Sequence, residues 1–389
     1  MGSGEELEVG PQRIGIVVNE PSGDQLAAAL VRALRAQRPG LRFEGMTGPA
    51  MEAEGCRSLA RIDPVMGLVE VLKHLPRLLR TRYRLQRHFR DHPPELFIGV
   101  DAPDFNLPLE RRLKRSGIKS AHLVSPTVWA WRPGRARGFA RTVDLMLCLY
   151  AFEVDFLRRY RVNARYVGHP LADEIPLQPR DAVTQRRDLG MRPADPAIAL
   201  LPGSRMSEVS RLSDIFIRTA RWCRQRRPEL QFVMPLVNGR IRHWVEARLA
   251  TLAPELPVTL LDRHPREAIQ AADAVLVASG TATLECLLLK RPMVVGYQVS
   301  PLTHWLLMDL GLLKIPHVAL ANLLSERPLA PEFLQQACRP EAMGQALLGF
   351  LDSPARVQEI RESYQRIHQG LRRQAAERAA EALLELLDS

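Results

Sequence analysis

The sequence lacks the cysteine patterns of metal sites and disulfide frameworks. Its 389 residues include five cysteines, which stand alone along the chain without a CxxC pair or a cysteine–histidine cluster. They are Cys56, Cys148, Cys223, Cys286 and Cys338. An odd, dispersed set of this kind indicates reduced thiols and a cytosolic protein, and gives no sign of a zinc centre.

Long apolar runs are also missing. The longest candidates, residues 145–152 and 274–289, are too short or too interrupted for the ~18 apolar residues that span a bilayer. The first ten residues are acidic and hold no apolar core of a signal peptide. We therefore expect a cytoplasmic protein without a membrane span.

Several familiar catalytic motifs do not occur. The chain has no GxSxG, HExxH or GxxxxGK[ST] motif, and its first strand-to-helix turn lacks the GxGxxG spacing of dinucleotide sites. These absences argue against the hydrolases, zinc enzymes and nucleotide-binding proteins that those motifs define.

Acidic residues are outnumbered by basic ones. The chain has 54 Lys and Arg against 43 Asp and Glu, so its formal net charge is +11. A nucleic acid, an anionic membrane surface or phosphorylated substrates would each explain this excess, and so would ordinary solvated arginines. The hydrophobic fraction of 46% is that of a globular chain long enough for two α/β domains.

Apolar strand patterns alternate with helical patterns along the chain. Strands are expected at residues 13–18, 95–101, 120–124, 145–150, 197–201, 231–234, 273–278 and 293–297. Helices are expected at residues 23–37, 107–115, 207–226, 241–251, 281–290 and 354–387, the last with a break near Gly370. The alternation predicts parallel sheets in two lobes, with ligands in the cleft between them at the carboxyl ends of the strands.

The most informative turn is Pro-Gly-Ser-Arg at residues 202–205, between a buried strand and an amphipathic helix. Free backbone N–H groups and the positive end of the helix converge there. Gly203 admits a ligand close to the backbone, and Arg205 adds a fork of charged donors. We expect this turn to hold an anion, most naturally a phosphate.

A second such turn comprises Ser279, Gly280 and Thr281, with Glu285 one helical turn later. Its N–H groups suit a phosphate, and the carboxylate suits the hydroxyls of a ribose. Simple capping of the helix by Thr281 is the alternative.

Asp101 follows an almost wholly apolar strand. A carboxylate at such a strand end faces the ligand and is partly desolvated, which makes it a stronger base. Asp104 and Asn106 come shortly after it, and Asp104 is also a candidate cap of the next helix.

Polar and aromatic residues of the first half suit a sugar. Glu20, Ser22 and Asp24 surround the first turn, where an acidic pair favours hydroxyls over phosphate, although Ser22 also has the spacing of a helix cap. Trp129 lies near Arg132 and suits stacking on a sugar or base, or simple core packing. The remaining candidate, His169, is a base, a hydrogen-bond donor to a phosphate, a hinge residue or a structural histidine.

The segment at residues 65–90 is apolar and basic together. Residues 71–90 contain seven Lys and Arg and no acidic residue. This pattern suits contact with anionic lipid, and a solvated helix face is the alternative. The expected acyl-chain contacts are Val71, Leu72, Leu75 and Leu79.

Together, these motifs resemble the lipid-A-disaccharide synthase family over nearly the whole chain. The matching segments are EPSGD (20–24), VMGLVEVL (65–72), FIGVDAPDFN (97–106), VSPTVWAWR (124–132), VGHPLAD (167–173), ALLPGSRMSEV (199–209), ASGTATLE (278–285) and PMVVGY (292–297). The chain departs from the family at Asn19, where a small residue is usual, and at Ala321, where proline usually precedes the asparagine.

The resemblance implies a GT-B glycosyltransferase with two Rossmann-like lobes. The first would comprise residues 12–172 completed by 354–389, and the second residues 173–353. It implies inverting transfer from UDP-2,3-diacylglucosamine to 2,3-diacylglucosamine 1-phosphate (lipid X), giving a β-1,6-linked disaccharide 1-phosphate and UDP. No cofactor or metal is implied. The enzyme would sit on the cytoplasmic face of the inner membrane, and a homodimer with exchanged C-terminal segments is the implied assembly.

The resemblance also assigns roles to residues. Asp101 would be the catalytic base. The nucleotide would be held by Gly203, Ser204, Arg205, Glu208, Ser279, Gly280, Thr281, Glu285 and Asn322. The acceptor would be bound by Glu20, Ser22, Asp24, Asp104, Asn106, Trp129, Arg132 and His169. Two other classes stay open: a UDP-sugar epimerase of similar architecture, and a basic RNA-binding protein, although no nucleic-acid motif accompanies the charge.

Overall fold

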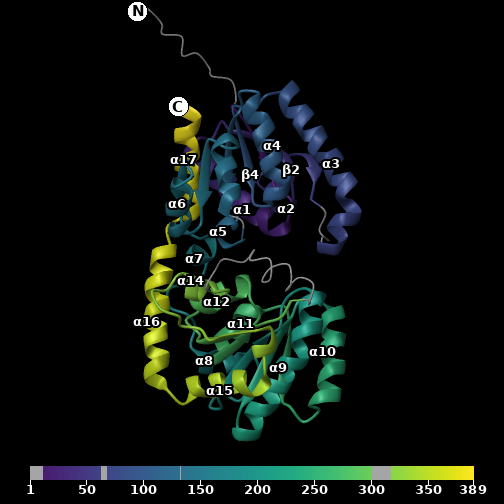
Figure 1. Cartoon of the computed structure of the whole chain (residues 1–389), viewed down its shortest axis with the longest axis vertical. Coiled ribbons are helices and arrows are strands. Elements are labelled where there is room, and N and C mark those ends of the chain that lie inside the picture. Colours follow the sequence, from purple (N-terminus) through teal and green to yellow (C-terminus); the bar gives the residue numbers. More distant parts are fainter. Residues whose placement is uncertain (1–11, 63–67, 132, 300–316) are drawn as a thin grey trace, which may run out of the picture. The chain divides into compact units, whose positions relative to one another are not determined.

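The computed structural model describes residues 12–62, 68–131, 133–299 and 317–389, without the side chains of residues 68–75 and 131 (Figure 1). The chain divides into two compact units. The first comprises Met1–Asp173 with Leu371–Ser389, and the second is Glu174–Gly370.

The first unit is built on a seven-stranded parallel sheet of order β3-β2-β1-β4-β5-β6-β7. Its strands are β1 (Arg13–Val17), β2 (Arg42–Thr47), β3 (Arg57–Arg61), β4 (Leu96–Val100), β5 (Lys119–Leu123), β6 (Leu145–Cys148) and β7 (Ala164–Tyr166). The central strands β1, β4 and β6 are buried along almost their whole length. Continuous burial is typical of a parallel sheet whose two faces are both covered.

Helices cover both faces of this sheet. They are α1 (Pro21–Gln37), α2 (Pro49–Ala53), α3 (Leu68–Asp91), α4 (Pro103–Arg115), α5 (Val128–Trp131), the 3₁₀ helix η1 (Pro133–Arg141), α6 (Ala151–Arg158), α7 (Pro170–Glu174) and α17 (Ala375–Asp388). Helix α17 packs beside α1, and α3 packs beside α4 (Figure 1). The last helix of the chain is therefore part of the first unit.

The second unit has a six-stranded parallel sheet of order β10-β9-β8-β11-β12-β13. Its strands are β8 (Ala197–Leu201), β9 (Gln231–Leu236), β10 (Val258–Asp262), β11 (Ala274–Val277), β12 (Met293–Tyr297) and β13 (Glu332–Leu334). Its helices are α8 (Ala182–Asp188), α9 (Met206–Arg226), α10 (Gly239–Leu252), α11 (Pro265–Ala271), α12 (Thr281–Leu288), α14 (Leu320–Leu323), the 3₁₀ helix η3 (Gln335–Ala337), α15 (Pro340–Leu351) and α16 (Pro354–Leu371).

The strand order places a topological switch point in each sheet. In the first unit β1 and β4 are neighbours, and in the second β8 and β11 are neighbours, while the chain leaves each pair toward opposite edges. Ligands of doubly wound sheets bind at the carboxyl ends of such a pair. The Glu20 turn and Asp101 follow β1 and β4, and the Arg205 and Ser279 turns follow β8 and β11.

The C-terminal segment differs from the prediction. We expected residues 354–389 to complete the first lobe, but α16 belongs to the second unit and only residues from Leu371 onward join the first. Tyr364 of α16 is fully buried, and His368 lies 2.5 Å from the Lys290 ammonium group, which fixes α16 to the second unit. The chain then passes Gly168 so closely that a Cβ there would lie 2.7 Å from the Cβ of Arg373.

Candidate active site

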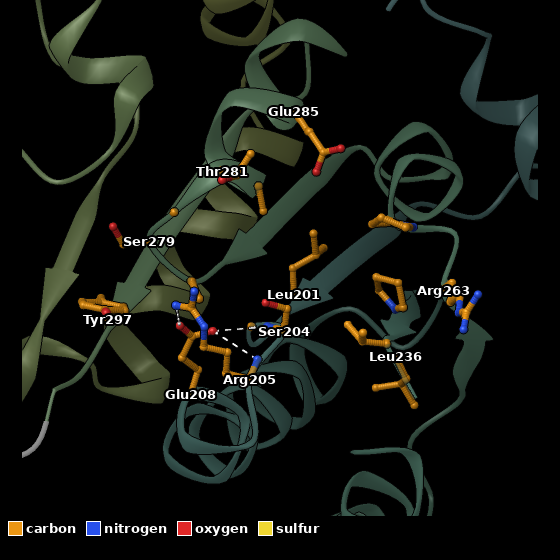
Figure 2. Close-up of a pocket in the computed structure, with 17 residues that line it drawn as sticks. Leu201, Ser204, Arg205, Glu208, Leu236, Arg263, Ser279, Thr281, Glu285 and Tyr297 are labelled. Atoms are coloured by element: carbon orange, nitrogen blue, oxygen red, sulfur yellow. Dashed lines mark hydrogen bonds and ion pairs between the residues drawn. The ribbon is translucent and has the colours of Figure 1, made fainter. Parts of the chain in front are cut away.

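A cavity of about 410 Å³ lies at the carboxyl edge of the second unit's sheet. The loops after β8, β9 and β11 line it, together with Tyr297 at the end of β12 (Figure 2). Both turns that the sequence singled out border this cavity. The prediction that they converge on one site is confirmed for the second unit.

The turn at residues 202–205 has the predicted strand–turn–helix geometry. Arg205 is the extended residue that precedes α9, and its side chain is 66% exposed. Gly203 has a φ of 121°, and a Cβ at this position would lie 2.6 Å from Glu208 Oε2. Glycine is required here both for the backbone conformation and for the room that the Glu208 side chain needs.

Glu208 occupies the donors of this turn. Its Oε2 accepts hydrogen bonds from the backbone N–H groups of Ser204 (3.2 Å) and Arg205 (3.4 Å), and Oε1 lies 3.5 Å from Arg205 Nη1 (Figure 2). The expectation that these N–H groups are free was wrong, because the Glu208 carboxylate already satisfies them. A diphosphate that binds the same two N–H groups must displace this carboxylate.

The second turn, residues 279–281, places the start of α12 beside the cavity. Gly280, with a φ of 144°, is the cap residue of α12, and Ser279 Oγ donates to the Val318 carbonyl (3.2 Å). Thr281 is the first residue of the helix and gives it no side-chain cap, so its interpretation as an ordinary cap was wrong. Its side chain is exposed at the cavity.

Glu285 is held by an arginine that the sequence did not single out. Arg266 Nε donates to Glu285 Oε1 (3.2 Å), and Arg266 Nη1 donates to Glu174 Oε1 (2.7 Å). Burial raises the pKa of Glu285, and the Arg266 charge opposes that rise. Because Arg266 comes from α11, no local spacing in the sequence could have linked it to Glu285.

Asn322 does not fit its expected role as a nucleotide contact. The side chain is 4% exposed and lies outside the lining of the cavity. Its Nδ2 donates to the Ala330 carbonyl and to Glu332 Oε1 (2.7 Å each), while Oδ1 accepts from the N–H groups of Leu329 and Ala330. These bonds tie one loop to another, so the side chain is structural.

In the first unit, Asp101 ends β4 in a strained conformation. Asp101 and Ala102 have φ values of 52° and 41°, in the left-handed region that non-glycine residues rarely adopt. The side chain of Asp101 is half-buried, and its N–H donates to the Leu123 carbonyl (2.9 Å). The turn thus presents the carboxylate at the carboxyl end of the sheet, as predicted.

Asn106 supports this turn, and its expected role in substrate binding is wrong. It is fully buried, and its Nδ2 approaches the carbonyls of Asp101 (2.8 Å), Val100 (3.1 Å) and Val17 (3.4 Å). A side chain so enclosed reaches no ligand. It joins the end of β1 to the end of β4 and holds the backbone of Asp101 in place.

Asp24 is a structural residue as well. It is 3% exposed and accepts hydrogen bonds from the N–H groups of Gly48 (3.1 Å), Ala50 (2.9 Å) and Met51 (3.1 Å) at the start of α2. Its carboxylate is therefore unavailable to the acceptor. Ser22 does not cap α1, because the helix begins at Pro21 after Glu20; both Glu20 and Ser22 are exposed.

Trp129 is anchored by a buried carboxyl group. Its Nε1 donates to Glu153 Oε1 (3.3 Å), and its ring meets Phe152 edge to face at 4.9 Å. Glu153 Oε2 accepts from the Tyr150 N–H (3.1 Å), and burial raises the pKa of Glu153 to about 8. The indole is half-buried, and Arg132 lies outside the described residues.

His169 is buried in the fold, whereas Asp104 is exposed to solvent. His169 is 9% exposed, its Nδ1 accepts from the Leu171 N–H (3.2 Å), and burial lowers its pKa to about 4, so the ring is neutral. The backbone N–H of His169 donates to the Leu371 carbonyl (2.9 Å). Together with the burial of the ring, this bond favours the structural interpretation. The Asp104 side chain is 86% exposed beside Arg135 and does not cap α4, contrary to that alternative.

Helix α3 carries the apolar and basic segment. Leu79 and Tyr83 on it are 44% and 62% exposed, while the side chains of Val71, Leu72 and Leu75 lie outside the described residues. Within the described ranges, no helix combines the length and apolar character needed to cross a membrane.

Comparison with known proteins decides the family. A family model described as lipid-A-disaccharide synthetase matches residues 14–386. The lipid-A-disaccharide synthase of Serratia proteamaculans is 47% identical, over 97% of this chain and 98% of its own length. The chain belongs to the lipid-A-disaccharide synthase family. Its predicted class, a glycosyltransferase that forms the lipid A disaccharide, is thereby confirmed.

Solved structures with low identity share the fold of this lipid-A-disaccharide synthase family member. The UDP-GlcNAc 2-epimerase of Neisseria meningitidis, bound to UDP-GlcNAc, has a TM-score of 0.63 at 11% identity and covers 96% of this chain and 100% of its own. The calicheamicin glycosyltransferase CalG4 has a TM-score of 0.57 at 16% identity and covers 97% and 98%. The predicted GT-B class with two Rossmann-like lobes is confirmed.

Proposed function

We propose that this enzyme transfers a diacylglucosamine unit from UDP-2,3-diacylglucosamine to the 6-hydroxyl of 2,3-diacylglucosamine 1-phosphate (lipid X), releasing UDP. The observation that carries the proposal is the cavity of the second unit. It gathers the Arg205 turn, the Ser279 turn and Glu285 at one switch point. These are the groups that a diphosphate and a ribose require.

The cavity is proposed to hold the UDP part of the donor. Arg205 and the start of α12 would bind the diphosphate, and Glu285 would accept hydrogen bonds from the ribose hydroxyls. The Arg266 contact fixes the orientation of Glu285, and the Arg266 charge opposes the rise in the Glu285 pKa that burial causes. Glu208 would turn away from the Ser204 and Arg205 N–H groups as the diphosphate replaces it.

Asp101 is the proposed general base. It would take the proton of the acceptor's 6-hydroxyl while that oxygen attacks the anomeric carbon of the donor, and the bond to UDP breaks on the opposite side. A single displacement of this kind inverts the anomeric carbon, which gives the β-linkage. The charge that develops on UDP would be stabilised by Arg205 and the two turns, without a metal ion or cofactor.

The acceptor would meet the first unit. Glu20, Ser22 and Asp104 are exposed and Trp129 is half-buried, so they remain candidates for its polar groups. Helix α3 would contact acyl chains and anionic headgroups from the cytoplasmic face of the inner membrane. The homodimer with exchanged C-terminal segments stays a prediction, which a sedimentation experiment would test.

The deciding experiment measures UDP release from UDP-2,3-diacylglucosamine with and without lipid X. We expect release that requires both lipids, together with a disaccharide 1-phosphate product. Asp101→Ala should abolish this product while UDP binding survives. UDP-sugar epimerisation without lipid X would contradict the proposal, and near-normal turnover of Asp101→Ala would remove Asp101 as the base.

A further inference from the structure

A second cavity, of about 770 Å³, lies in the second unit between α8, α16 and the turn before β12. Asp273, which borders it, immediately precedes β11, and Arg291 lies two residues before β12. The cavity therefore lies at the amino ends of the strands, whereas the cavity with Arg205 lies at their carboxyl ends. The two cavities lie at opposite ends of the strands of one sheet.

Basic side chains dominate this cavity. Its cationic lining residues are Arg180, Arg186, Lys290, Arg291, Arg361 and Arg366. Three of them have partners within the fold, and Arg180 is paired with Asp188 (2.6 Å). Arg186 binds Asp273 (2.6 Å) and main-chain carbonyls, and the Lys290 ammonium lies against His368 and the Leu288 carbonyl.

The carboxylates of the cavity already have donors. Asp273 is held by Arg186, and Asp181 caps α8 by accepting from the Thr184 N–H (2.8 Å). Glu362 accepts from Gln358 (2.9 Å) on the same helix. None of these bonds neutralises Arg291 or Arg361.

Arg291 and Arg361 are the unusual pair. Arg291 is 6% exposed, and among the described residues its Nη2 reaches only main-chain carbonyls, those of Gln270 (2.7 Å) and Arg180 (3.5 Å). In the part of the chain that the structure describes, the buried Nε atoms of Arg291 and Arg361 have no hydrogen-bond partner. Buried donors without an acceptor are costly and rare.

The electrostatics agree with this geometry. Burial, reinforced by the charges of Arg361 and Arg186 and only partly opposed by those of Asp273 and Asp181, lowers the pKa of Arg291 to about 10. An anion placed between the two guanidinium groups would accept from both and relieve their repulsion. Arg366, exposed on the next turn of α16 with only Ser363 as its described partner, extends the positive surface toward solvent.

We propose that this cavity is a second anion site, which binds a phosphate or diphosphate group between Arg291 and Arg361. Arginine forks match the geometry of phosphate oxygens, so a phosphoryl group fits better than a chloride. The group can belong to a soluble phosphate compound or to the headgroup of an anionic phospholipid.

The test titrates the full-length enzyme with pyrophosphate by calorimetry. Wild type should show two binding events, one weakened in Arg361→Gln and the other weakened in Arg205→Gln. Removing one charged donor should weaken the affected event about tenfold or more. Arg218→Gln, which removes an exposed charge from α9 of the same unit, is the matched control.

Arg361→Gln should leave UDP affinity unchanged, which separates this site from the nucleotide cavity. Arg366→Gln, on an exposed turn of α16, supplies the same test with a weaker effect if Arg361→Gln fails to fold. Pyrophosphate binding that is equal in Arg361→Gln, Arg366→Gln and Arg218→Gln overturns the proposal.

Vesicles distinguish the two sources of the phosphate. Phosphatidylcholine vesicles with and without phosphatidylglycerol are sedimented with wild type and Arg361→Gln. A decrease of phosphatidylglycerol-dependent binding in the variant, with competition by pyrophosphate, assigns the site to a lipid headgroup, while the binding that remains is that expected of α3. Unchanged vesicle binding, with weakened pyrophosphate binding, assigns it to a soluble phosphate compound.

Discussion

Replacement of Asn106 by alanine should impair catalysis, although the buried Asn106 side chain does not contact the substrate. An NH₂ group has two hydrogens, so of the three nearby carbonyls the amide bonds best to those of Asp101 (2.8 Å) and Val100 (3.1 Å). The variant leaves these buried carbonyls without that donor, at about 1–2 kcal/mol each. We expect the free energy of unfolding to fall by about 2–4 kcal/mol.

Catalysis should suffer because Asp101 depends on that bond. Two successive left-handed residues, Asp101 and Ala102, are held in place partly by the Asn106 amide. A displacement of the catalytic carboxylate by about 1 Å would lower kcat by about 100-fold. UDP affinity should be unchanged, because the proposed nucleotide cavity belongs to the other unit.

Urea denaturation and UDP-release kinetics measure the two effects. The matched control is Asn163→Ala, since Asn163 Nδ2 also donates to a main-chain carbonyl, that of Asp144 (3.0 Å), but at an exposed position. If Asn106→Ala matches this control in both unfolding free energy and kcat, Asn106 does not position Asp101 and the reasoning is refuted.

Three further predictions concern the nucleotide, pH and the membrane. Arg205→Ala should weaken UDP binding by about 10–100-fold in calorimetry, whereas Arg218→Ala should not; equal affinities would remove Arg205 from the diphosphate site. Burial raises the pKa of Glu153 from 4.5 to about 8, so between these pH values the folded chain keeps a proton that the unfolded chain loses. The free energy of unfolding should therefore fall as pH rises from 4.5 to about 8. Thermal denaturation of Glu153→Gln should show a smaller fall over the same pH range. Leu79→Ser should reduce sedimentation of the protein with vesicles more than it reduces activity on short-chain substrates. The control, Trp244→Ser on the second unit, should leave sedimentation unchanged. Equal sedimentation of Leu79→Ser and wild type would contradict the membrane role of α3.

Most buried strands were predictable because their sequences are continuously apolar, but the buried strand β2 was missed because Glu44 and Gly45 interrupt its apolar residues. The strand predicted at residues 293–297 coincides with β12, and those predicted at 13–18 and 197–201 match β1 and β8 within one residue. Edge strands were missed. β3 and β10 are only half-buried or exposed, so their sequences lack the apolar runs that identify a covered strand.

The candidate site was also predicted only in part. Turn motifs predicted where ligands would bind, because strand order alone brings the residues after β8 and β11 together. Sequence did not distinguish polar residues that face a ligand from those that face the backbone. Asp24, Asn106 and Asn322 were each candidate ligand contacts, yet hydrogen bonds to groups of the fold itself occupy their side chains.

The return of the chain to the first unit at Leu371 has a consequence for how the protein is made. The second unit is one uninterrupted stretch, Glu174–Gly370, and can fold as soon as it has left the ribosome. The first unit begins earlier but lacks α17, the partner of α1, until the last residues are synthesised. Asp173 then accepts from the N–H groups of Gln374 and Ala375, so the aspartate at which the chain first leaves this unit binds the segment that returns to it, 201 and 202 residues later. The half that is translated first is therefore completed last, and a gene cut after residue 173 would leave the surfaces of α1, β5 and β6 that α17 contacts without their cover.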